Sequence, residues 1–258
     1  MLCRDIMKLI ECTYPKTAAL EWDNVGLLIG RVEKDVQKIY VALDASDEVI
    51  ADAIAKGADM LVTHHPLIFE PQKTITNEYF IGDRVVKLLQ HDISYYAMHT
   101  NYDVLGMAEL SSKILGLQDT EVLELTNPDQ GEGIGRVGSL SEEMTLKCCC
   151  ELVKEKFHLD NVKVFGDLNT IVRRVAISPG SGKHMSSLAV EKGADVFITG
   201  DMDHHEGIDA VAQGLAIIDA GHYGLEHIFI GDIAGYLQEH TPNIEILTAD
   251  IRQPFQII

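Results

Sequence analysis

The chain has 258 residues, of which 46% are hydrophobic and 24% are charged, and its formal net charge is −19 at pH 7. This length is sufficient for one large core or for two similar halves, and the composition is ordinary for a globular protein. The charge argues against a nucleic-acid surface, because phosphate binding requires clustered lysine and arginine and the chain shows no such cluster.

Neither a membrane span nor a disulfide framework is indicated. No apolar run approaches the roughly 18–20 residues of a spanning helix, and the first residues lack a signal-peptide pattern. The five cysteines are odd in number, three of them are consecutive (Cys148, Cys149 and Cys150), and no C-x-x-C pair occurs. We therefore expect reduced thiols and a cytoplasmic location.

The first part of the chain is predicted to alternate between helices and strands. Apolar residues at helical spacing predict helices at residues 2–11, 47–56, 80–90 and 107–115. Short apolar runs predict strands at residues 38–43, 60–62 and 94–98, and a glycine leads into a further strand after Trp22. Ser46 is a typical N-cap for the second helix, and Gly57 is typical of the position after its end.

Two adjacent histidines follow one of these strands. Residues 61–66 read L-V-T-H-H-P, so a buried strand ends in His64 and His65. Neighbouring imidazoles at such a position are costly to bury unless they bind something, and metal ions are the usual partner. The next predicted strand leads to His99, with Asp103 four residues further on. Open α/β sheets bind ligands at the carboxyl ends of their strands, which makes these residues candidates for a site.

The chain contains an internal duplication. The segment at 54–63, which includes K-G-A-D, reappears at 190–199. Each copy is followed by a polar loop, a helix and a strand that ends near a histidine, His99 in the first copy and His222 in the second. A repeat with unusual residues at matching points predicts two related α/β units.

The second part repeats this plan. Helices are predicted at residues 145–157 and 225–239, and strands at 172–177, 196–199, 216–219, 244–248 and 255–258. Cys149 and Cys150 fall on the apolar face of the first of these helices, which favours a role as small core residues. We predict a first half at 1–117, an acidic connection without period at 118–140, and a second half at 141–258. Alternating strands and helices indicate α/β/α layers with largely parallel sheets.

The spacing of His222 and Glu226, H-x-x-x-E, places both side chains on one face of a helix. With His64, His65 and Asp103 they make a set of three imidazoles and two carboxylates. These side chains are too many to bind a single tetrahedral ion that keeps one coordination position open. The set suits two borderline ions such as zinc, iron or manganese, bridged by a carboxylate. Two such ions can turn water into hydroxide near neutral pH, which is hydrolytic chemistry.

Other motifs are incomplete. The G-S-G-K run at 180–183 resembles a P-loop, but the first glycine is missing and His184 replaces the magnesium-binding Ser or Thr. The same segment does not fit the serine-hydrolase elbow either. Asp201, His204 and His205 are explained equally well as outer support of a metal site and as solvated loop residues.

At these motifs the chain resembles the Nif-three-like family, many members of which carry the name GTP cyclohydrolase type-two homologue. The matching motifs are W-D-N-V-G-L from Trp22, T-H-H-P from Thr63, H-T-N-Y-D from His99, T-G-D-M-D-H-H-E from Thr199 and G-H-Y-G-L-E from Gly221. They span nearly the whole chain in the family's order. The resemblance implies an α/β fold of duplicated α/β/α units with pseudo-two-fold related halves.

The resemblance also implies a site and an assembly. It implies metal ligands at His64, His65, Asp103, His222 and Glu226, and catalytic residues lining the site at His99 and His205. It implies two divalent ions per chain and a homohexamer, a trimer of dimers whose sites face an internal cavity. The chain departs from the family at His204, where a tyrosine is more frequent, and it is too short for the inserted domain of longer members.

Two functional hypotheses follow. The first is a cytoplasmic, dinuclear metal-dependent hydrolase related to the GTP cyclohydrolase type-two homologues. It would act on a small nucleotide-like or cyclic substrate with a C–N or phosphoester bond. The alternative is a non-catalytic metal-binding protein, such as a regulator, a metal chaperone, a transcription-related partner or a scaffold. It predicts bound metal without an exchangeable water position.

Overall fold

The structure is a computed structural model that describes residues 1–258. The chain is a mixed α/β protein with two sheets, and it forms two compact units. The first unit comprises Met1–Tyr102 and Phe229–Arg252, and the second comprises Asp103–Ile228 and Gln253–Ile258. Every helix falls short of the length and hydrophobicity that crossing a bilayer requires.

The first unit is built on a five-stranded sheet with the order β1-β4-β3-β2-β11. Its elements are α1 (Cys3–Thr13), η1 (Lys16–Ala18), β1 (Gly26–Ile29), β2 (Lys38–Ala42), α2 (Asp47–Ala55), β3 (Met60–Thr63), α3 (Phe80–Gln90), β4 (Ser94–Ala97), α4 (Thr100–Tyr102), α10 (Ile228–His240) and β11 (Glu245–Thr248). All neighbouring strands are parallel except β1, which runs antiparallel to β4 at the edge. The carboxyl ends of β2, β3 and β4 therefore lie side by side.

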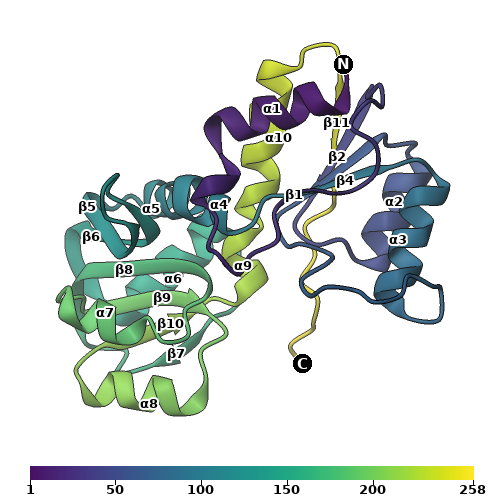
Figure 1. Ribbon diagram of the computed structural model, residues 1–258. Helices are drawn as coiled ribbons and strands as arrows, with labels where there is room; N and C mark the ends of the chain where they lie inside the picture. The colour runs from purple at the N-terminus through teal and green to yellow at the C-terminus, as the bar shows by residue number, and fades with distance from the viewer. The chain divides into compact units, whose positions relative to one another are not determined.

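Helices cover both faces of this sheet, as Figure 1 shows. On one face, Ile50 of α2 and Leu88 of α3 pack in a core with Leu61 of β3 and Tyr95 of β4. On the other side lie α1 and α10, which are joined by the hydrogen bond from the Tyr236 hydroxyl to the Leu9 carbonyl (2.9 Å). The strands are buried on both faces because helices cover them on both sides, which explains their continuous apolar runs.

The second unit is built on a six-stranded sheet with the order β5-β6-β8-β9-β10-β7. Its elements are the π-helical turn η2 (Asp103–Met107), α5 (Ala108–Leu115), β5 (Gln118–Asn127), β6 (Glu132–Thr145), α6 (Leu146–Phe157), β7 (Lys163–Phe165), β8 (Ile171–Ser181), α7 (Ser186–Glu191), β9 (Val196–Gly200), α8 (His204–Ala212), β10 (Ala216–Asp219) and α9 (His222–Glu226). Strands β8, β9 and β10 are parallel, and β7 runs antiparallel to β10.

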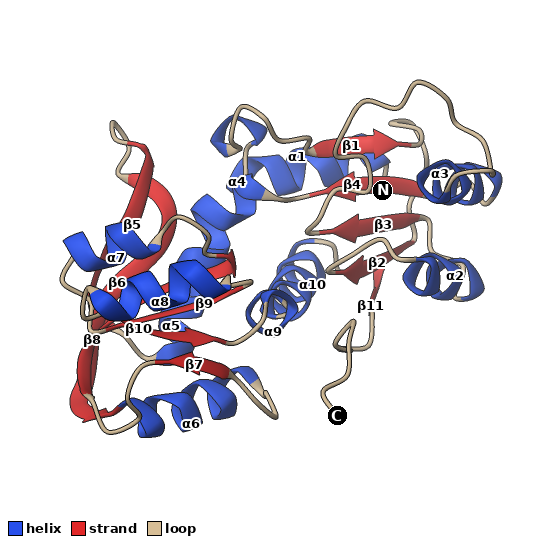
Figure 2. Ribbon diagram, turned by 90° about the horizontal axis from the view of Figure 1, so that it is seen from below, coloured by secondary structure: helices blue, strands red, loops and turns tan.

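Side chains of its central strands alternate between two cores, one on each face. Val196 and Ile198 of β9 pack in the core that contains α6, whereas Phe197 packs in the core that contains α7 and α8. Cys149 and Cys150 are buried in the first of these cores, as predicted. Helices α7 and α8 lie on one side of the sheet and α6 on the other (Figure 2). Alternation with period two is what a strand covered on both faces produces.

The internal repeat extends to individual hydrogen bonds. In the first K-G-A-D turn, Asp59 Oδ2 accepts the backbone N–H groups of residues 37–38, at 2.9 and 3.1 Å. In the second turn, Asp195 Oδ2 accepts those of residues 173–174, both at 2.8 Å. Each aspartate thereby ties the start of one strand to the start of its parallel neighbour. This fixes the register, and hence the point at which each strand ends.

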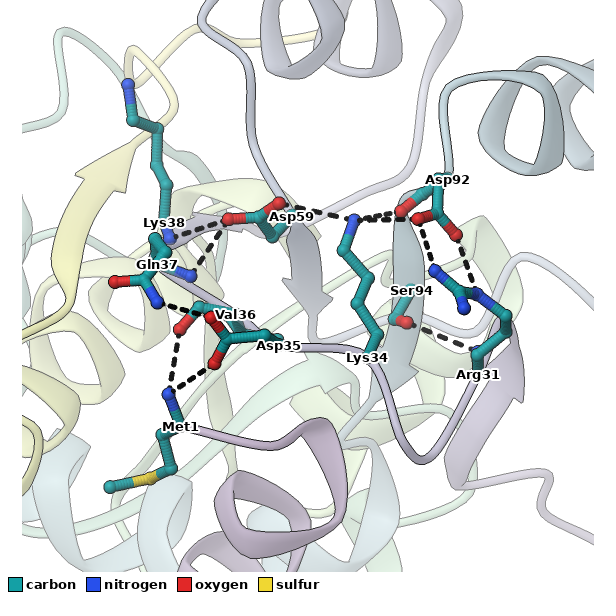
Figure 3. Close-up of polar contacts among 10 residues, drawn as sticks. All are labelled: Met1, Arg31, Lys34, Asp35, Val36, Gln37, Lys38, Asp59, Asp92 and Ser94. Carbon is teal, nitrogen blue, oxygen red and sulfur yellow. Dashed lines mark hydrogen bonds and ion pairs between the residues drawn. The ribbon is translucent and has the colours of Figure 1, made fainter.

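A charged network closes the amino edge of the first sheet (Figure 3). Lys34 is only 8% exposed, and its ammonium group lies 3.2 Å from Asp59 Oδ1 and 3.7 Å from Asp92 Oδ2. Arg31 forms a two-pronged ion pair with the same Asp92. Burial of an ammonium group is costly unless such carboxylates lie close to it. Asp59 and Asp92 precede β3 and β4, so this network stabilises the edge opposite to the candidate histidines.

Residues 118–140 differ from the prediction of an irregular connection, because they form most of the antiparallel pair β5 and β6. Leu123 is the only fully buried side chain of β5, which leaves that strand without a hydrophobic period. In β6, glycines occupy inward positions. A Cβ on Gly133 would lie 1.9 Å from the Glu124 carbonyl oxygen. Glycine is needed there because the strands approach closely, and it conceals the alternation that would indicate a strand.

The unit boundaries also differ from a division at 117 and 141. Residues 229–252 join the first unit, because β11 pairs in parallel with β2 and α10 lies beside α1. The predicted strand at 244–248 is confirmed as β11. The predicted strand at 255–258 is wrong: the segment has no regular structure and its apolar side chains Phe255, Ile257 and Ile258 are exposed. Apolar composition alone does not make a strand where no partner strand is present.

Candidate functional site

The loop after β3 holds the two adjacent histidines by their backbone. The N–H groups of His64 and His65 both donate to the Leu43 carbonyl, at 3.1 and 3.0 Å. Thr63 Oγ1 donates to the His65 carbonyl at 2.8 Å. Leu43 follows β2 directly, so the ends of two neighbouring parallel strands position this loop. His64 is buried and His65 is partly buried.

His99 belongs to the same cluster. It follows β4, the parallel neighbour of β3, and its ring centroid lies 5.3 Å from that of His64 and 5.6 Å from that of His65. One ligand atom from each of the three histidines lies within 4.8 Å of the others. The structure thus brings together two residues predicted as ligands and one predicted as catalytic. Three imidazoles this close could hold a metal ion.

An oxygen acceptor orients each of the three rings. The acceptors are the Met98 carbonyl for His64 (2.8 Å), Asp44 Oδ1 for His65 (2.8 Å) and Asp23 Oδ1 for His99 (2.9 Å). A carbonyl or carboxylate oxygen can only accept, so Nδ1 carries the proton in each ring. The lone pair of the neutral imidazole is then on Nε2. Metal-binding histidines are typically held in this way, because the acceptor fixes both tautomer and ring orientation.

Asp23 is a functional candidate that the sequence did not reveal. Its side chain is 0% exposed, and besides His99 it accepts from the Thr100 N–H (2.9 Å), the Thr100 hydroxyl (2.5 Å) and the Asn24 N–H (2.8 Å). Burial by itself raises the pKa of Asp23, but the bonds from His99 and Thr100 outweigh it and lower the pKa to about 2. Asp23 is therefore ionised at neutral pH, and its Oδ1 accepts the Nδ1 proton of His99.

Asp103 lies at the first position of the π-helical turn η2, directly after Tyr102 in the chain. It is partly buried. π-Helical turns are uncommon and frequently occur at functional sites, since they reorient one side chain within a helix. The sequence placed Asp103 four residues beyond His99, and the structure places it at the start of this distorted turn.

In the second unit, the predicted H-x-x-x-E pair lies on the short helix α9. His222 Nε2 is 3.0 Å from Glu226 Oε2, and His222 Nδ1 donates to Asp201 Oδ2 at 2.7 Å. Glu226 is buried, whereas His222 is about one-third exposed (33%). Asp201 follows β9 and adopts a positive φ of 56°. The arrangement repeats the pattern of the first unit, in which a carboxylate that follows a strand fixes a histidine.

Two glycines leave the space that the His222 backbone and the Glu226 side chain occupy. A Cβ on Gly180, whose φ is +79°, would lie 2.4 Å from Glu226 Oε1. A Cβ on Gly200 would lie 2.4 Å from the backbone nitrogen of His222. The contact at Gly180 is with the end of a side chain. The contact at Gly200 is with the backbone of α9, so it can be relieved only if that helix shifts.

We expect Gly200→Ala to destabilise the protein by about 3 kcal/mol, because the added methyl group displaces the backbone at the start of α9. Thermal or urea unfolding measures the change. Gly231→Ala is the matched control: this glycine lies in α10 with no atom within 4 Å of the added Cβ, and the change should stabilise by up to about 1 kcal/mol. Equal unfolding midpoints for both variants would contradict the assigned contact.

A cavity of about 780 Å³ lies beside His222 in the second unit. Its wall includes Asp160, Asp201, Asp219 and Lys163, together with the terminal segment 253–258. The Lys163 ammonium group is bound to Asp219 Oδ2 at 2.7 Å, which leaves the other carboxylates in excess. The volume is in the range of small-molecule sites.

His205, the second predicted catalytic residue, lies exposed in the first turn of α8. Its ring packs edge-to-face on that of His204, with a centroid separation of 5.2 Å. A catalytic role for His205 stays a prediction. Asp203 caps the helix by accepting the Glu206 N–H at 2.9 Å.

The carboxylates of Glu226 and Asp201 favour the protonated form of His222. Burial by itself lowers the pKa of His222, but the hydrogen bonds and charges of Glu226 and Asp201 outweigh it and raise the pKa from 6.5 to about 9. In the metal-free protein this imidazole is therefore protonated at neutral pH. This protonation stabilises the metal-free fold fully below pH 6.5, and the contribution disappears as the pH rises through about 9.

We expect metal binding at His222 to weaken as the pH falls. A metal ion binds the neutral imidazole, so below a pH of about 9 it must displace a proton. The apparent affinity then falls by up to about tenfold per pH unit. Zinc titrations by calorimetry, in buffers of different ionisation enthalpy, count the released protons. Asp201→Asn lowers the pKa of His222 and should release fewer protons near neutral pH; identical proton release would refute the assignment.

The comparisons with known proteins agree over the whole chain. The model of the Duf34/NIF3 (NGG1p interacting factor 3) family matches residues 1–254. A Clostridium perfringens protein named GTP cyclohydrolase 1 type 2 homolog is 35% identical over 262 aligned residues, which cover 100% of both chains.

Solved structures show the same fold. The crystal structure of a Bacillus cereus protein related to NIF3 has a TM-score of 0.91 at 27% identity, covering 100% of this chain and 99% of that one. Reduced HcgD from Methanocaldococcus jannaschii has a TM-score of 0.83 at 31% identity, covering 97% and 98%. The resemblance inferred from the motifs is confirmed, and the chain belongs to the Duf34/NIF3 family.

Proposed function

We propose that the protein is a metal-dependent hydrolase that binds two divalent ions through His64, His65, Asp103, His222 and Glu226. The observation that carries the proposal is the cluster of His64, His65 and His99, whose three Nδ1 atoms are each held by an oxygen acceptor. In His64 and His65 the fixed tautomer leaves the Nε2 lone pair to bind a cation, and in His99 it leaves that lone pair to take a proton.

The donor set fits such ions. Imidazole and carboxylate ligands together suit zinc, iron or manganese, and a buried carboxylate such as Glu226 adds the negative charge that a divalent ion requires. When bound, the ions would lower the pKa of a coordinated water and stabilise negative charge that develops on the substrate. The acceptor bonds of the histidines preorganise the ligands before a metal arrives.

Within this proposal, His99 moves protons. Its Nδ1 proton is held by the ionised Asp23, so Nε2 can take a proton from the attacking water and the imidazolium that forms is stabilised by the carboxylate. The same nitrogen can then return the proton to the leaving group. His205, exposed on α8, is the alternative proton carrier.

The substrate class we propose is a small nucleotide-like or cyclic molecule with a C–N or phosphoester bond. The curated relative from C. perfringens carries the name GTP cyclohydrolase 1 type 2 homolog, so GTP belongs in the first panel of substrates. The cavity beside His222 has the volume for a ligand of this size. The protein is proposed to work in the cytoplasm as a homohexamer, a trimer of dimers, which sedimentation of the full chain tests.

The decisive experiment measures metal content and hydrolysis together. Purified protein is loaded with zinc, iron or manganese and assayed with GTP, cyclic amides and phosphoesters, beside Glu226→Gln and the exposed control Glu239→Gln. We expect about two ions per chain and turnover that Glu226→Gln abolishes. Two bound ions with no turnover across the panel would favour the non-catalytic metal-binding alternative. Absence of metal after loading would overturn both.

A further inference from the structure

Two large aromatic side chains stand exposed beside the histidine cluster. Trp22 is 59% exposed and Phe69 is 48% exposed. Their rings are nearly parallel, with an interplanar angle of 24° and a centroid separation of 5.9 Å. Single exposed apolar residues are common on protein surfaces, but a stacked pair next to a cluster of oriented histidines requires an explanation.

Both rings contact the same imidazole. The His99 ring lies 5.8 Å from that of Trp22 and 5.5 Å from that of Phe69, with interplanar angles of 73° and 72°. A planar molecule that stacks on the pair is therefore nearly perpendicular to His99 and within reach of it. His99 in turn belongs to the cluster with His64 and His65.

Hydrogen bonds next to each ring hold the pair in place. Asn24 Nδ2 donates to the Ile68 carbonyl at 2.6 Å, which joins the loop that carries Trp22 to the loop that carries Phe69. Asp23, the neighbour of Trp22, is fixed by His99 and Thr100. The two rings are thus held before any ligand binds, which reduces the entropy lost on binding.

The residues next to Trp22 and Phe69 in the chain disfavour binding of a polyanionic ligand. Glu21 precedes Trp22 and Glu70 follows Phe69, and both glutamates are exposed. No lysine or arginine lies within two residues of either aromatic residue, and the whole chain carries a net charge of −19. An aromatic surface whose neighbours in the chain are acidic favours a ring that is neutral or cationic, because aromatic faces also attract cations.

We propose that Trp22 and Phe69 form a stacking platform for a planar heteroaromatic ring, neutral or cationic, that lies beside His99. This deepens the proposed function and rests on it, since it assigns the platform to the substrate of that site. It narrows the substrate class to ring compounds without a polyphosphate chain. Trp22 and Phe69 are then residues that determine specificity.

The single tryptophan provides the measurement, because all indole emission comes from Trp22. The full chain, with and without zinc, is titrated with adenosine, with the cation 1-methylnicotinamide, with GTP and with inositol as a non-aromatic control. We expect saturable quenching by the first two compounds, weaker quenching by GTP and none by inositol. Stacking does not require the metal, so the quenching persists in metal-free protein.

Phe69→Ala keeps the reporter and removes half of the platform. Loss of one aromatic stacking partner should weaken ring binding by about tenfold or more. Phe80→Ala is the matched control, because Phe80 is 52% exposed and contacts Tyr79 and Arg84 instead. Absence of saturable quenching, or equal affinity in wild type and Phe69→Ala, overturns the platform. A contact between copies of the chain would instead make the Trp22 emission depend on protein concentration and would change the oligomeric state in Phe69→Ala. That pair of results also overturns the platform.

These outcomes separate the platform from the proposed function. Ring binding without hydrolysis in metal-loaded protein supports the platform and counts against the hydrolase. Metal-dependent hydrolysis without any ring binding supports the hydrolase and overturns the platform.

Discussion

His65→Ala protein is expected to bind divalent metal more weakly than wild type by more than about a hundredfold. Changes to the partners of metal-binding histidines typically cost ten- to a hundredfold, and removal of the ligand itself must cost more. His65 is the clearest member of the cluster to test, because it is partly exposed and its ring can be removed without leaving a closed cavity. His64 is buried, so His64→Ala combines the loss of a ligand with a cavity.

The measurement is zinc affinity by competition with a chromophoric chelator, with metal per chain from mass spectrometry. His91→Ala is the matched control in the same unit: His91 is exposed and its Nδ1 also bonds to a carbonyl, that of Lys87, at 2.9 Å. The control should keep wild-type affinity. If His65→Ala binds zinc as wild type does, the histidine cluster is not a metal site and the hydrolase proposal loses its basis.

The sequence predicted the parts of the site that depend on short-range patterns. His64 and His65 follow an apolar strand directly, and the spacing of His222 and Glu226 matches one turn of helix, which the structure bears out with a 3.0 Å contact. The K-G-A-D repeat likewise predicted two related units. In each case the physical cause, strand burial or helical period, acts within a few residues.

Partners far apart in the chain could not be predicted in this way. Asp23 is separated from His99 by 76 residues, and Asp44 from His65 by 21. Nothing local marks Asp23 as an acceptor, whereas Asp44 carries a usable signal, since it lies just beyond the end of a buried parallel strand. The general need of a metal-binding histidine for an acceptor predicts that such residues exist, but only the fold identifies them.

Strands rich in glycine and polar residues also could not be predicted from the sequence. Gly133 and Gly135 occupy inward positions of β6, so hydrophobic alternation is absent where strand geometry is present. The β5–β6 pair is stabilised by a backbone ladder, whose partners are known only from the fold. At the other extreme, segment 255–258 has the composition of a strand but no partner strand.

Asp23→Asn is expected to lower the turnover of the metal-loaded protein by about a hundredfold and to destabilise the fold by about 3 kcal/mol. Each carboxylate oxygen of Asp23 accepts from two donors. Oδ1 accepts from His99 Nδ1 and the Asn24 N–H, and Oδ2 from the Thr100 N–H and hydroxyl. An asparagine places an NH₂ group against one of these pairs in either orientation. Where it faces His99, it stabilises the tautomer with the proton on Nε2, the nitrogen that must take the proton from the attacking water.

Glu21→Gln, an exposed change in the same loop, is the control and should leave both quantities unchanged. Acid unfolding adds an independent readout. The folded-state pKa of Asp23 is about 2 and its ordinary value is 3.8, so its stabilising contribution is complete above 3.8 and is lost as the pH falls through 2. Asp23→Asn should lose less stability over that interval than wild type. Reduced turnover with unchanged acid unfolding would show that Asp23 orients His99 but does not stabilise the fold through its charge. Unchanged turnover would show that His99 works without Asp23.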